Sequence, residues 1–338
     1  EKIEQQRFLK DVVHGDVLDP DVLDPPAAPA RRTRTPAPKM IESAGFCHRG
    51  EGVHMDSLEP RDTDATRNAA AAPAVAFFDV DGTLTYHRDG VAEDQVAPSE
   101  RVRRALEAFT ARGNIAVLCT GRPPITVSPA LRACPFTAKI MLAGGCVEFG
   151  DEVVHHEFMP RDLLTRLVDE LASVRMSAFF ETSSRCLLVE WPETPLSFDI
   201  GYEHTSIDEL RGMLDTLEVS KVVLESHRLD LLESVMPFIR EHFVISNLGV
   251  GEHEITLPST TKRNGMQVVL SELRRRGVQV GTVYGFGDSE NDVSMLEAAD
   301  VAVVMGNALP QVRAYADYVT DTVQEDGVVT ALEHFGLV

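Results

Sequence analysis

Apolar runs alternate with amphipathic segments along the chain from residue 74 onward. Ser99 is expected to cap a helix that ends at Gly113, and a second helix is expected to begin near Gly265 and to end at Gly277. Strands that alternate with helices predict an α/β fold with a Rossmann-like, doubly wound parallel sheet. Its strands are predicted from four nearly continuous apolar runs, which are typical of strands buried on both faces: 74–78 (AVAFF), 115–119 (IAVLC), 280–287 (VGTVYGFG) and 301–305 (VAVVM).

The pattern changes in the middle of this region, where helical and alternating segments mix. We expect residues 148–254 to form an α+β cap domain inserted into a core made of residues 74–147 and 255–338. The spacing of the motifs leaves room for this insertion, because Lys262 lies 142 positions after Thr120. The elements expected in the insertion are helices at 163–174, 210–217 and 231–243, a strand pair within 178–191, and strands at 222–225, 244–246 and 254–257.

The first 73 residues have a different composition. They hold eight of the 19 prolines, a basic patch (RRTRTPAPK) and an alanine tract, and they show no sustained helical or strand period. A segment with this much proline and so few apolar residues cannot offset the entropy of ordering. We therefore expect residues 1–73 to be disordered. Whether they form a functional arm or follow from the assignment of the start site is left open.

The charge of the chain excludes several classes of partner. The 338 residues include 53 acidic and 32 basic side chains, which gives a formal charge of −21 and an isoelectric point near 4.9. Nucleic acids and anionic membranes require a basic face, so we expect neither as a partner. No apolar run reaches the roughly 18 residues of a membrane span, and the first residues lack an apolar signal segment. A soluble, cytoplasmic protein is expected.

The cysteines support the same compartment. Their number is odd and no C-x-x-C pair occurs, which argues against a disulfide framework or a zinc site. We expect reduced thiols that pack as small apolar groups: Cys47, Cys119, Cys134, Cys146 and Cys186.

Polar residues follow the predicted strands at the point where each strand ends. The carboxyl ends of parallel strands meet at one edge of a sheet, which is where ligands of such sheets bind. Carboxylates brought together there would repel by about 4 kcal/mol per pair at 4 Å in an effective dielectric of 20. Oxygen ligands of this kind favour Mg²⁺. The residues concerned are Asp79 and Asp81 after the first strand, Thr120, Gly121 and Arg122 after the second, Asp288, Asn291 and Asp292 after the third, and Lys262 before a helix.

At these residues the sequence resembles the haloacid dehalogenase superfamily of phosphohydrolases, and within it the Cof-type phosphatases of sugars and cofactors. The resemblance covers residues 74–338, and the motifs occur in the family's order. They are FFDVDGTLT (77–85), LCTGRPP (118–124), TTKRNGMQVVL (260–270), GFGDSENDVSML (285–296), MGNA (305–308) and VTDTVQEDGVVTAL (319–332).

The resemblance implies a role for each motif residue. Asp79 matches the nucleophile that forms an aspartyl-phosphate, and Asp81 matches the general acid/base. For binding the phosphate, the matching residues are Thr120, Lys262, Gly121 and Asn291. For binding Mg²⁺, they are Asp288, Asp79, the backbone carbonyl of Asp81 and Asp292. Asp292 would also orient Lys262.

Further positions are candidates for contact with the substrate. Arg122 is expected either to contact the phosphate or leaving group or to form a salt bridge at a helix end or between the domains. Cof-type proteins usually have Asn-Gly where this chain has Ala143-Gly144-Gly145, so a contact from that Asn is missing, although both glycines still permit a close backbone approach. Glu181, on the predicted strand pair of the cap, is a candidate for selecting the substrate.

These features together predict a Mg²⁺-dependent phosphatase that hydrolyses a small phosphorylated metabolite, such as a sugar, polyol or cofactor phosphate. A phosphomutase or phosphotransferase with the same aspartyl-phosphate is the alternative enzyme. A non-catalytic metal-binding regulator is the alternative of another class.

Overall fold

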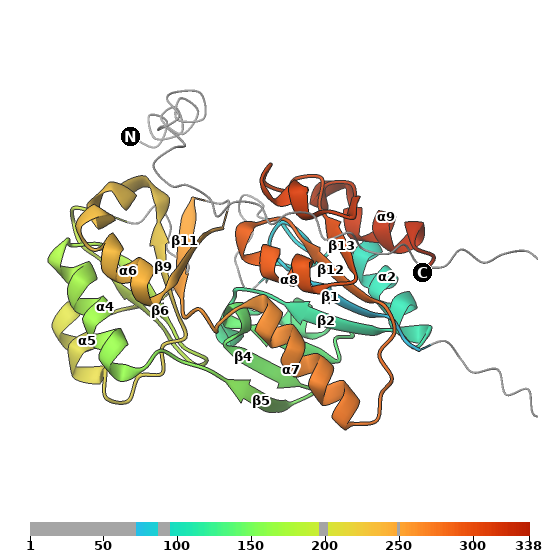
Figure 1. Cartoon of the computed structure of the whole chain (residues 1–338), viewed down its shortest axis with the longest axis horizontal. Helices are drawn as coiled ribbons and strands as arrows, with labels where there is room; N and C mark the ends of the chain where they lie inside the picture. Colours follow the sequence, from blue (N-terminus) through green and yellow to red (C-terminus); the bar gives the residue numbers. More distant parts are fainter. Residues whose placement is uncertain (1–71, 87–94, 196–201, 249–250) are drawn as a thin grey trace, which may run out of the picture. The chain divides into compact units, whose positions relative to one another are not determined.

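The computed structural model describes residues 72–86, 95–195, 202–248 and 251–338. All but the last two residues of the segment expected to be disordered, 1–73, lie outside these ranges. The described residues form two β-sheets, one of eight strands and one of six. Figure 1 shows both sheets with the helices that cover them.

The larger sheet confirms the predicted doubly wound α/β fold. Its order is β14-β13-β12-β1-β2-β3-β4-β5, with parallel pairing from β14 to β3 and antiparallel pairing of β4 with both neighbours. The strands that follow β1 directly in the chain, β2 and β3, lie on one side of it, whereas β12, β13 and β14 lie on the other. The boundary between β1 and β12 is therefore the switch point of the fold. The strands are β1 (Val75–Phe78), β2 (Ile115–Cys119), β3 (Ala138–Met141), β4 (Cys146–Phe149), β5 (Glu152–His156), β12 (Val283–Gly287), β13 (Val301–Val304) and β14 (Tyr318–Val319).

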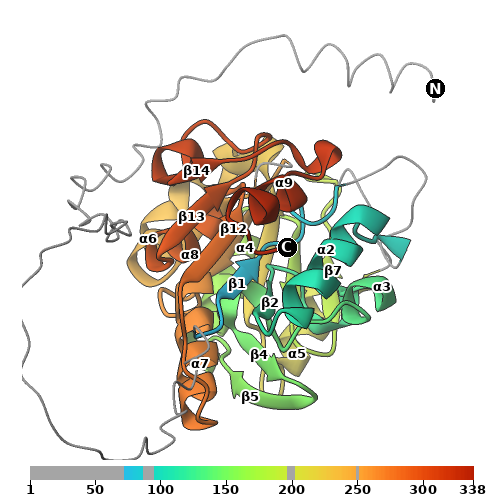
Figure 2. The same ribbon diagram turned by 90° about the vertical axis from the view of Figure 1, so that its right-hand side faces the viewer.

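Two pairs of helices cover the two faces of this sheet, as Figure 2 shows. Helices α2 (Glu100–Ala111) and α9 (Gly327–His334) pack on the face that carries Phe78. Helices α7 (Lys262–Arg275) and α8 (Val293–Ala298) lie on the face that carries Phe77. Successive residues of β1 therefore enter opposite cores, which explains why its sequence is apolar throughout. The short helices are α3 (Pro129–Arg132) and the 3-10 helices η3 (Pro124–Thr126), η4 (Leu142–Gly144), η6 (Glu290–Asp292), η7 (Val312–Tyr315) and η8 (Val323–Glu325).

The predicted ends of α2 are confirmed. The Ser99 hydroxyl accepts the Val102 N–H at 3.1 Å, and Gly113 adopts φ +85° just beyond the helix. Helix α7 begins earlier than predicted, because Thr261 caps it and makes Lys262 its first residue.

The strands of the smaller sheet come from residues 178–256, nearly all of them in the expected insertion, 148–254. Its helices α4 (Arg161–Ser173), α5 (Ile207–Met213) and α6 (Met236–His242) pack against one face. The opposite face carries a small cluster around Phe179 and Val223, and also Lys221. The order is β10-β11-β9-β6-β7-β8, with strands β6 (Ala178–Glu181), β7 (Cys186–Val189), β8 (Glu203–His204), β9 (Lys221–Glu225), β10 (Val244–Asn247) and β11 (Glu252–Thr256).

Two details of the insertion differ from the prediction. Its expected start at residue 148 falls inside β4, and β5 still pairs with β4 in the larger sheet. The helix expected at 231–243 is divided into a 3-10 helix, η5 (Ser226–Ser234), and α6. Pro237 explains the division, because proline lacks the N–H that a helix interior needs and fits only its first turn.

Four cysteines lie among the described residues, and all are buried and unbridged, as expected: Cys119, Cys134, Cys146 and Cys186. Across the part of the chain that the structure describes, no helix combines the length and the apolar character that crossing a membrane requires.

Candidate active site

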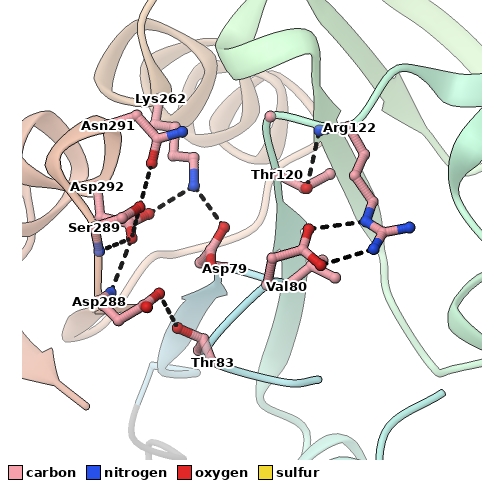
Figure 3. A network of polar contacts seen from close by, with 12 residues as sticks. Asp79, Val80, Thr83, Thr120, Arg122, Lys262, Asp288, Ser289, Asn291 and Asp292 are labelled. Carbon is pink, nitrogen blue, oxygen red and sulfur yellow. Dashed lines mark hydrogen bonds and ion pairs between the residues drawn. The ribbon is translucent and has the colours of Figure 1, made fainter. Parts of the chain in front are cut away.

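The strand ends on both sides of the switch point bring the predicted carboxylates together. Asp79 follows β1, Asp288 follows β12, and Asp292 ends the 3-10 helix η6 (Figure 3). Oxygen atoms of these three carboxylates lie within 4.8 Å of one another. Parallel pairing of β1 with β12 fixes this arrangement, since the Asp79 N–H donates to the carbonyl of Phe286 at 3.0 Å.

Lys262 lies between two of these carboxylates. Its Nζ is 2.6 Å from Oδ1 of Asp79 and 2.6 Å from Oδ1 of Asp292, and its side chain is 0% exposed. Burial opposes the charge of the ammonium group, but Asp292 and Asp79 raise its pKa well above the usual value. Lys262 is therefore a permanent positive charge at the carboxyl ends of the strands.

Both carboxylate oxygens of Asp292 accept hydrogen bonds. Its Oδ2 accepts the backbone N–H groups of Asp288 at 2.9 Å and of Ser289 at 3.0 Å, while its Oδ1 accepts from Lys262. These bonds fix the loop after β12 and the lysine together. One oxygen of Asp292 therefore accepts from Lys262 and the other from the backbone of the loop.

Asp288 faces the loop that follows β1. The Thr83 hydroxyl donates to its Oδ1 at 3.3 Å, and the Asn307 amide donates to its Oδ2 at 3.4 Å and to the Gly82 carbonyl at 2.8 Å. A Cβ atom on Gly82 would lie 2.1 Å from Asp288 Oδ2, and φ of Gly82 is +88°. Only glycine allows this approach.

The electrostatics of the cluster fit a divalent cation. Burial, followed by the charge of Asp292, raises the pKa of Asp79 to about 7. Burial and the charge of Asp79 raise the pKa of Asp288 to about 9. Both carboxylates therefore lack sufficient positive charge nearby, although Lys262 contacts one of them. Asp79 and Asp288 fit a hard cation by their oxygen donors and their mutual repulsion.

Asp81 points away from this cluster and toward Arg122. The guanidinium donates from Nε at 2.8 Å and from Nη2 at 2.7 Å, one bond to each carboxylate oxygen. Although burial opposes it, the charge of Arg122 holds the pKa of Asp81 below its usual value. The Asp81 side chain is still 49% exposed, so a substrate can reach it. Arg122 thus forms an ion pair with Asp81, in the loop that follows β1.

The turn at residues 120–122, here called the TGR turn, lies beside Asp81. The Arg122 N–H donates to the Thr120 hydroxyl at 3.1 Å, and the Thr120 N–H donates to Ile140 at 2.8 Å. The Gly121 carbonyl accepts from Lys221 of the smaller sheet at 2.7 Å. The Leu142 and Ala143 N–H groups also donate to the carbonyls of Arg122 and Thr120, so the loop after β3 holds the turn as well.

Asn291 and the two glycines occupy other surroundings. Asn291 accepts the Ser289 hydroxyl at 2.9 Å, and its Nδ2 would lie 3.5 Å from a Cβ on Gly121, on the site side of the turn. A Cβ on Gly144 would lie 2.1 Å from the carbonyl oxygen of Thr261, and one on Gly145 would lie 3.1 Å from Ser220. Both glycines are buried against protein atoms, so close packing explains why these two positions have no side chain.

The backbone before these glycines is strained at Ala143, and this strain does not explain why Ala replaces the usual Asn. This residue adopts φ +55° and ψ +23°, the left-handed region that Asn tolerates better than Ala. The Asn that is usual in Cof-type proteins fits the same backbone.

Sequence reasoning missed several polar partners of the site. Asn307 lies within the MGNA motif, for which the sequence predicted no role, and the sequence indicated no role for Lys221 either. Lys221 contacts a residue 100 positions earlier, a pairing that no local pattern reveals. Glu181, a candidate for substrate selection, instead lies 2.9 Å from Lys221 and is buried.

A doubly wound α/β fold with a lysine-bridged carboxylate cluster at its switch point defines an enzyme of the hydrolase type rather than a binding module. The chain belongs to the haloacid dehalogenase-like hydrolase family, whose sequence profile matches residues 76–332.

Known proteins resemble the chain over most of its length. YkrA of Bacillus subtilis is 26% identical over 275 residues, which are 77% of this chain and 97% of YkrA. The 5-amino-6-(5-phospho-D-ribitylamino)uracil phosphatase YitU of Bacillus subtilis is 26% identical over 295 residues, covering 78% of this chain and 98% of YitU. A solved structure of a sugar phosphatase of haloacid dehalogenase subclass IIB matches with a TM-score of 0.65 at 25% identity, covering 78% of this chain and 100% of the other.

Proposed function

We propose that the chain is a phosphomonoester phosphatase that uses Asp79 as its nucleophile. The observation that carries the proposal is the buried Asp79–Lys262–Asp292 bridge, with Asp288 beside it and Asp81 two residues along the same loop. Lys262 holds one oxygen of Asp79 and leaves the other to attack. A regulator without catalysis would not need a nucleophile held in this way.

The chain's own residues supply the groups that the two chemical steps need. Asp79 attacks phosphorus and forms an aspartyl-phosphate as the bond from phosphorus to the leaving oxygen breaks, and Asp81 gives that oxygen a proton. Because Arg122 keeps Asp81 ionised while the two are paired, Asp81 must leave this ion pair and take up a proton before it acts as the acid. Asp81 then takes a proton from the water that attacks the intermediate, and phosphate leaves. Lys262 and the Thr120 hydroxyl stabilise the charge on the transferring group.

Asp79 and Asp288 would hold the divalent cation, together with the backbone carbonyl of Asp81. Asp292 is better suited to orienting Lys262, because both of its oxygens already accept hydrogen bonds. We infer that the cation is Mg²⁺, since every candidate ligand is an oxygen atom. When bound, it would neutralise negative charge on the phosphoryl group.

The smaller sheet would act as a cap inserted into the catalytic core. Two contacts support this role, because they join the smaller sheet to loops of the core. Lys221 contacts Gly121 in the loop after β2, and the Asn247 N–H donates to Glu290, after β12, at 2.8 Å. A cap in this place excludes water from the reacting groups.

A small phosphorylated metabolite is the substrate class that the relatives support. YitU is named for a phosphorylated ribitylamino-uracil, and the matching structure is that of a sugar phosphatase. A phosphomutase would need a positive cap surface for a second phosphate. Lys221 approaches the TGR turn from the cap, but it lies between Glu181 and Glu254, which favours hydrolysis.

A screen of phosphorylated sugars, polyols and cofactors tests the proposal. Released phosphate is measured with Mg²⁺, and again after addition of a chelator. We expect release from at least one ester with Mg²⁺ and its loss with the chelator. An isomerised sugar phosphate without free phosphate would establish the mutase instead, and no turnover of any ester would favour the regulator.

A further inference from the structure

Lys221 links the smaller sheet to the TGR turn of the larger one. It begins β9, and its Nζ donates to the Gly121 carbonyl at 2.7 Å. The same Nζ lies 2.9 Å from Oε2 of Glu181 and 3.5 Å from Oε2 of Glu254. The Gly121 carbonyl accepts a hydrogen bond from this ammonium group, whereas Oε2 of Glu181 and Oε2 of Glu254 accept none and contribute their charge alone.

These charged groups are buried. The side chain of Lys221 is 4% exposed and that of Glu254 is 2% exposed. The Tyr202 hydroxyl donates to the other oxygen of Glu181 at 3.2 Å and so holds that carboxylate in place. A buried lysine that needed only charge compensation would be satisfied by the two glutamates. The third contact, to Gly121, aims the ammonium at the active site.

The carbonyl that Lys221 binds belongs to the peptide group between Gly121 and Arg122. The N–H of that same peptide donates to the Thr120 hydroxyl oxygen at 3.1 Å. A charge on the carbonyl oxygen polarises the peptide and strengthens the donation from its N–H. Since the hydroxyl oxygen accepts this bond, the hydroxyl proton of Thr120 is left to donate to another group.

We propose that Lys221 is a positioning residue that fixes the 121–122 peptide and thereby directs the Thr120 hydroxyl at the phosphate of the substrate. This inference rests on the proposed function, in which Thr120 binds the phosphoryl group. Lys221 comes from the smaller sheet, so the TGR turn is fully aligned only while that sheet lies against it. Closure of the cap and alignment of a phosphate ligand are then one event.

Lys221→Met tests the proposal, with Lys139→Met as the matched control. Lys139 also donates to a glycine carbonyl, that of Gly150 at 3.3 Å, and lies 3.6 Å from Glu148, away from the TGR turn. We expect Lys221→Met to lower kcat by about 10- to 100-fold, the size of one charge-assisted hydrogen bond, with a smaller change in KM. Lys139→Met should leave both constants within about twofold. Wild-type kcat in Lys221→Met would overturn the proposal.

A double-mutant cycle with Thr120→Val separates positioning from general support. If Lys221 acts through the Thr120 hydroxyl, the double variant should be no slower than Thr120→Val alone. If the two losses multiply, Lys221 does not act through Thr120 and the proposal fails.

A second variant addresses the uncompensated glutamates that Lys221→Met leaves behind. Lys221→Met combined with Glu181→Gln and Glu254→Gln removes the lysine together with both carboxylates that it contacts. We expect it to unfold at a temperature near that of the wild type and to show the same loss of kcat. Failure of both variants to fold would assign Lys221 to stability and overturn the inference.

Binding of orthovanadate with Mg²⁺, measured by calorimetry, distinguishes this inference from the proposed function. A wild-type protein that hydrolyses no ester contradicts the proposed function. Weaker vanadate binding in Lys221→Met than in Lys139→Met would support the positioning role even then. Equal binding by both variants would contradict it.

Discussion

Asp79, Asp288 and Asp292 place three carboxylates within 4.8 Å, and Lys262 offsets part of their charge. The sequence predicted this group because each member follows a strand of the larger sheet or lies at the start of a helix that packs on it. It could not predict how the members divide their work. Asp292 proved to be an acceptor for Lys262 and for backbone N–H groups, a role that depends on the fold of η6 rather than on spacing.

Asp288→Asn should make the stability of the metal-free protein less dependent on pH. Asp288 has a usual pKa of 3.8 and a pKa of about 9 in the folded chain, because of burial and then Asp79. A carboxyl group with a raised folded pKa stabilises fully below its unfolded pKa and loses that contribution as pH rises toward the folded value. The free energy of unfolding should therefore fall between pH 3.8 and about 9, and fall less in the variant.

Urea unfolding at a series of pH values, with a chelator present, measures this difference. Asp151→Asn, in the exposed turn between β4 and β5, is the control and should follow the wild type. A variant Asp288→Asn that loses as much stability as the wild type over the same window would show that Asp288 is not held in a repulsive cluster.

At the scale of helices and strands, local signals worked where they acted alone. Helix α2 begins after Ser99 and ends before Gly113, as expected, and the four apolar runs form strands β1, β2, β12 and β13. The start of the insertion was misplaced because β4 and β5 form an antiparallel hairpin that extends the larger sheet. Whether such a hairpin joins one sheet or another is decided by long-range pairing, which sequence periodicity does not contain.

Two glycine-to-alanine substitutions should have opposite effects on stability. Gly113 ends α2 with φ +85°, and Ala there should cost about 1 kcal/mol because its Cβ disfavours that region. Gly212 lies exposed inside α5 without a positive φ, and Ala there should add about 0.5–1 kcal/mol through helix propensity. Nothing lies within 4 Å of either added Cβ, so packing does not interfere.

Denaturant unfolding of both variants checks this pair, and phosphate release should stay at the wild-type rate. Equal changes of the same sign would mean that backbone conformation does not control these two positions.

At the scale of the whole molecule, the sequence predicted two nested units from the 142 residues between Thr120 and Lys262, and the structure has two sheets. The contact between Lys221 and Gly121 was beyond prediction, because it depends on how the second sheet meets the first. The formal charge of −21 does not indicate which carboxylates lie together. Their roles follow from position at the switch point, and the local charge there is set by Lys262, Arg122 and the proposed cation.

Phosphate release by the wild type and by Asp79→Asn, side by side with Mg²⁺ and the best ester of the screen, tests the central claim most directly. Asn keeps the size of Asp but cannot form the aspartyl-phosphate, so we expect kcat to fall by about 10,000-fold or more while the protein remains folded. Turnover by Asp79→Asn at a rate near that of the wild type would contradict the assignment of Asp79 as the nucleophile.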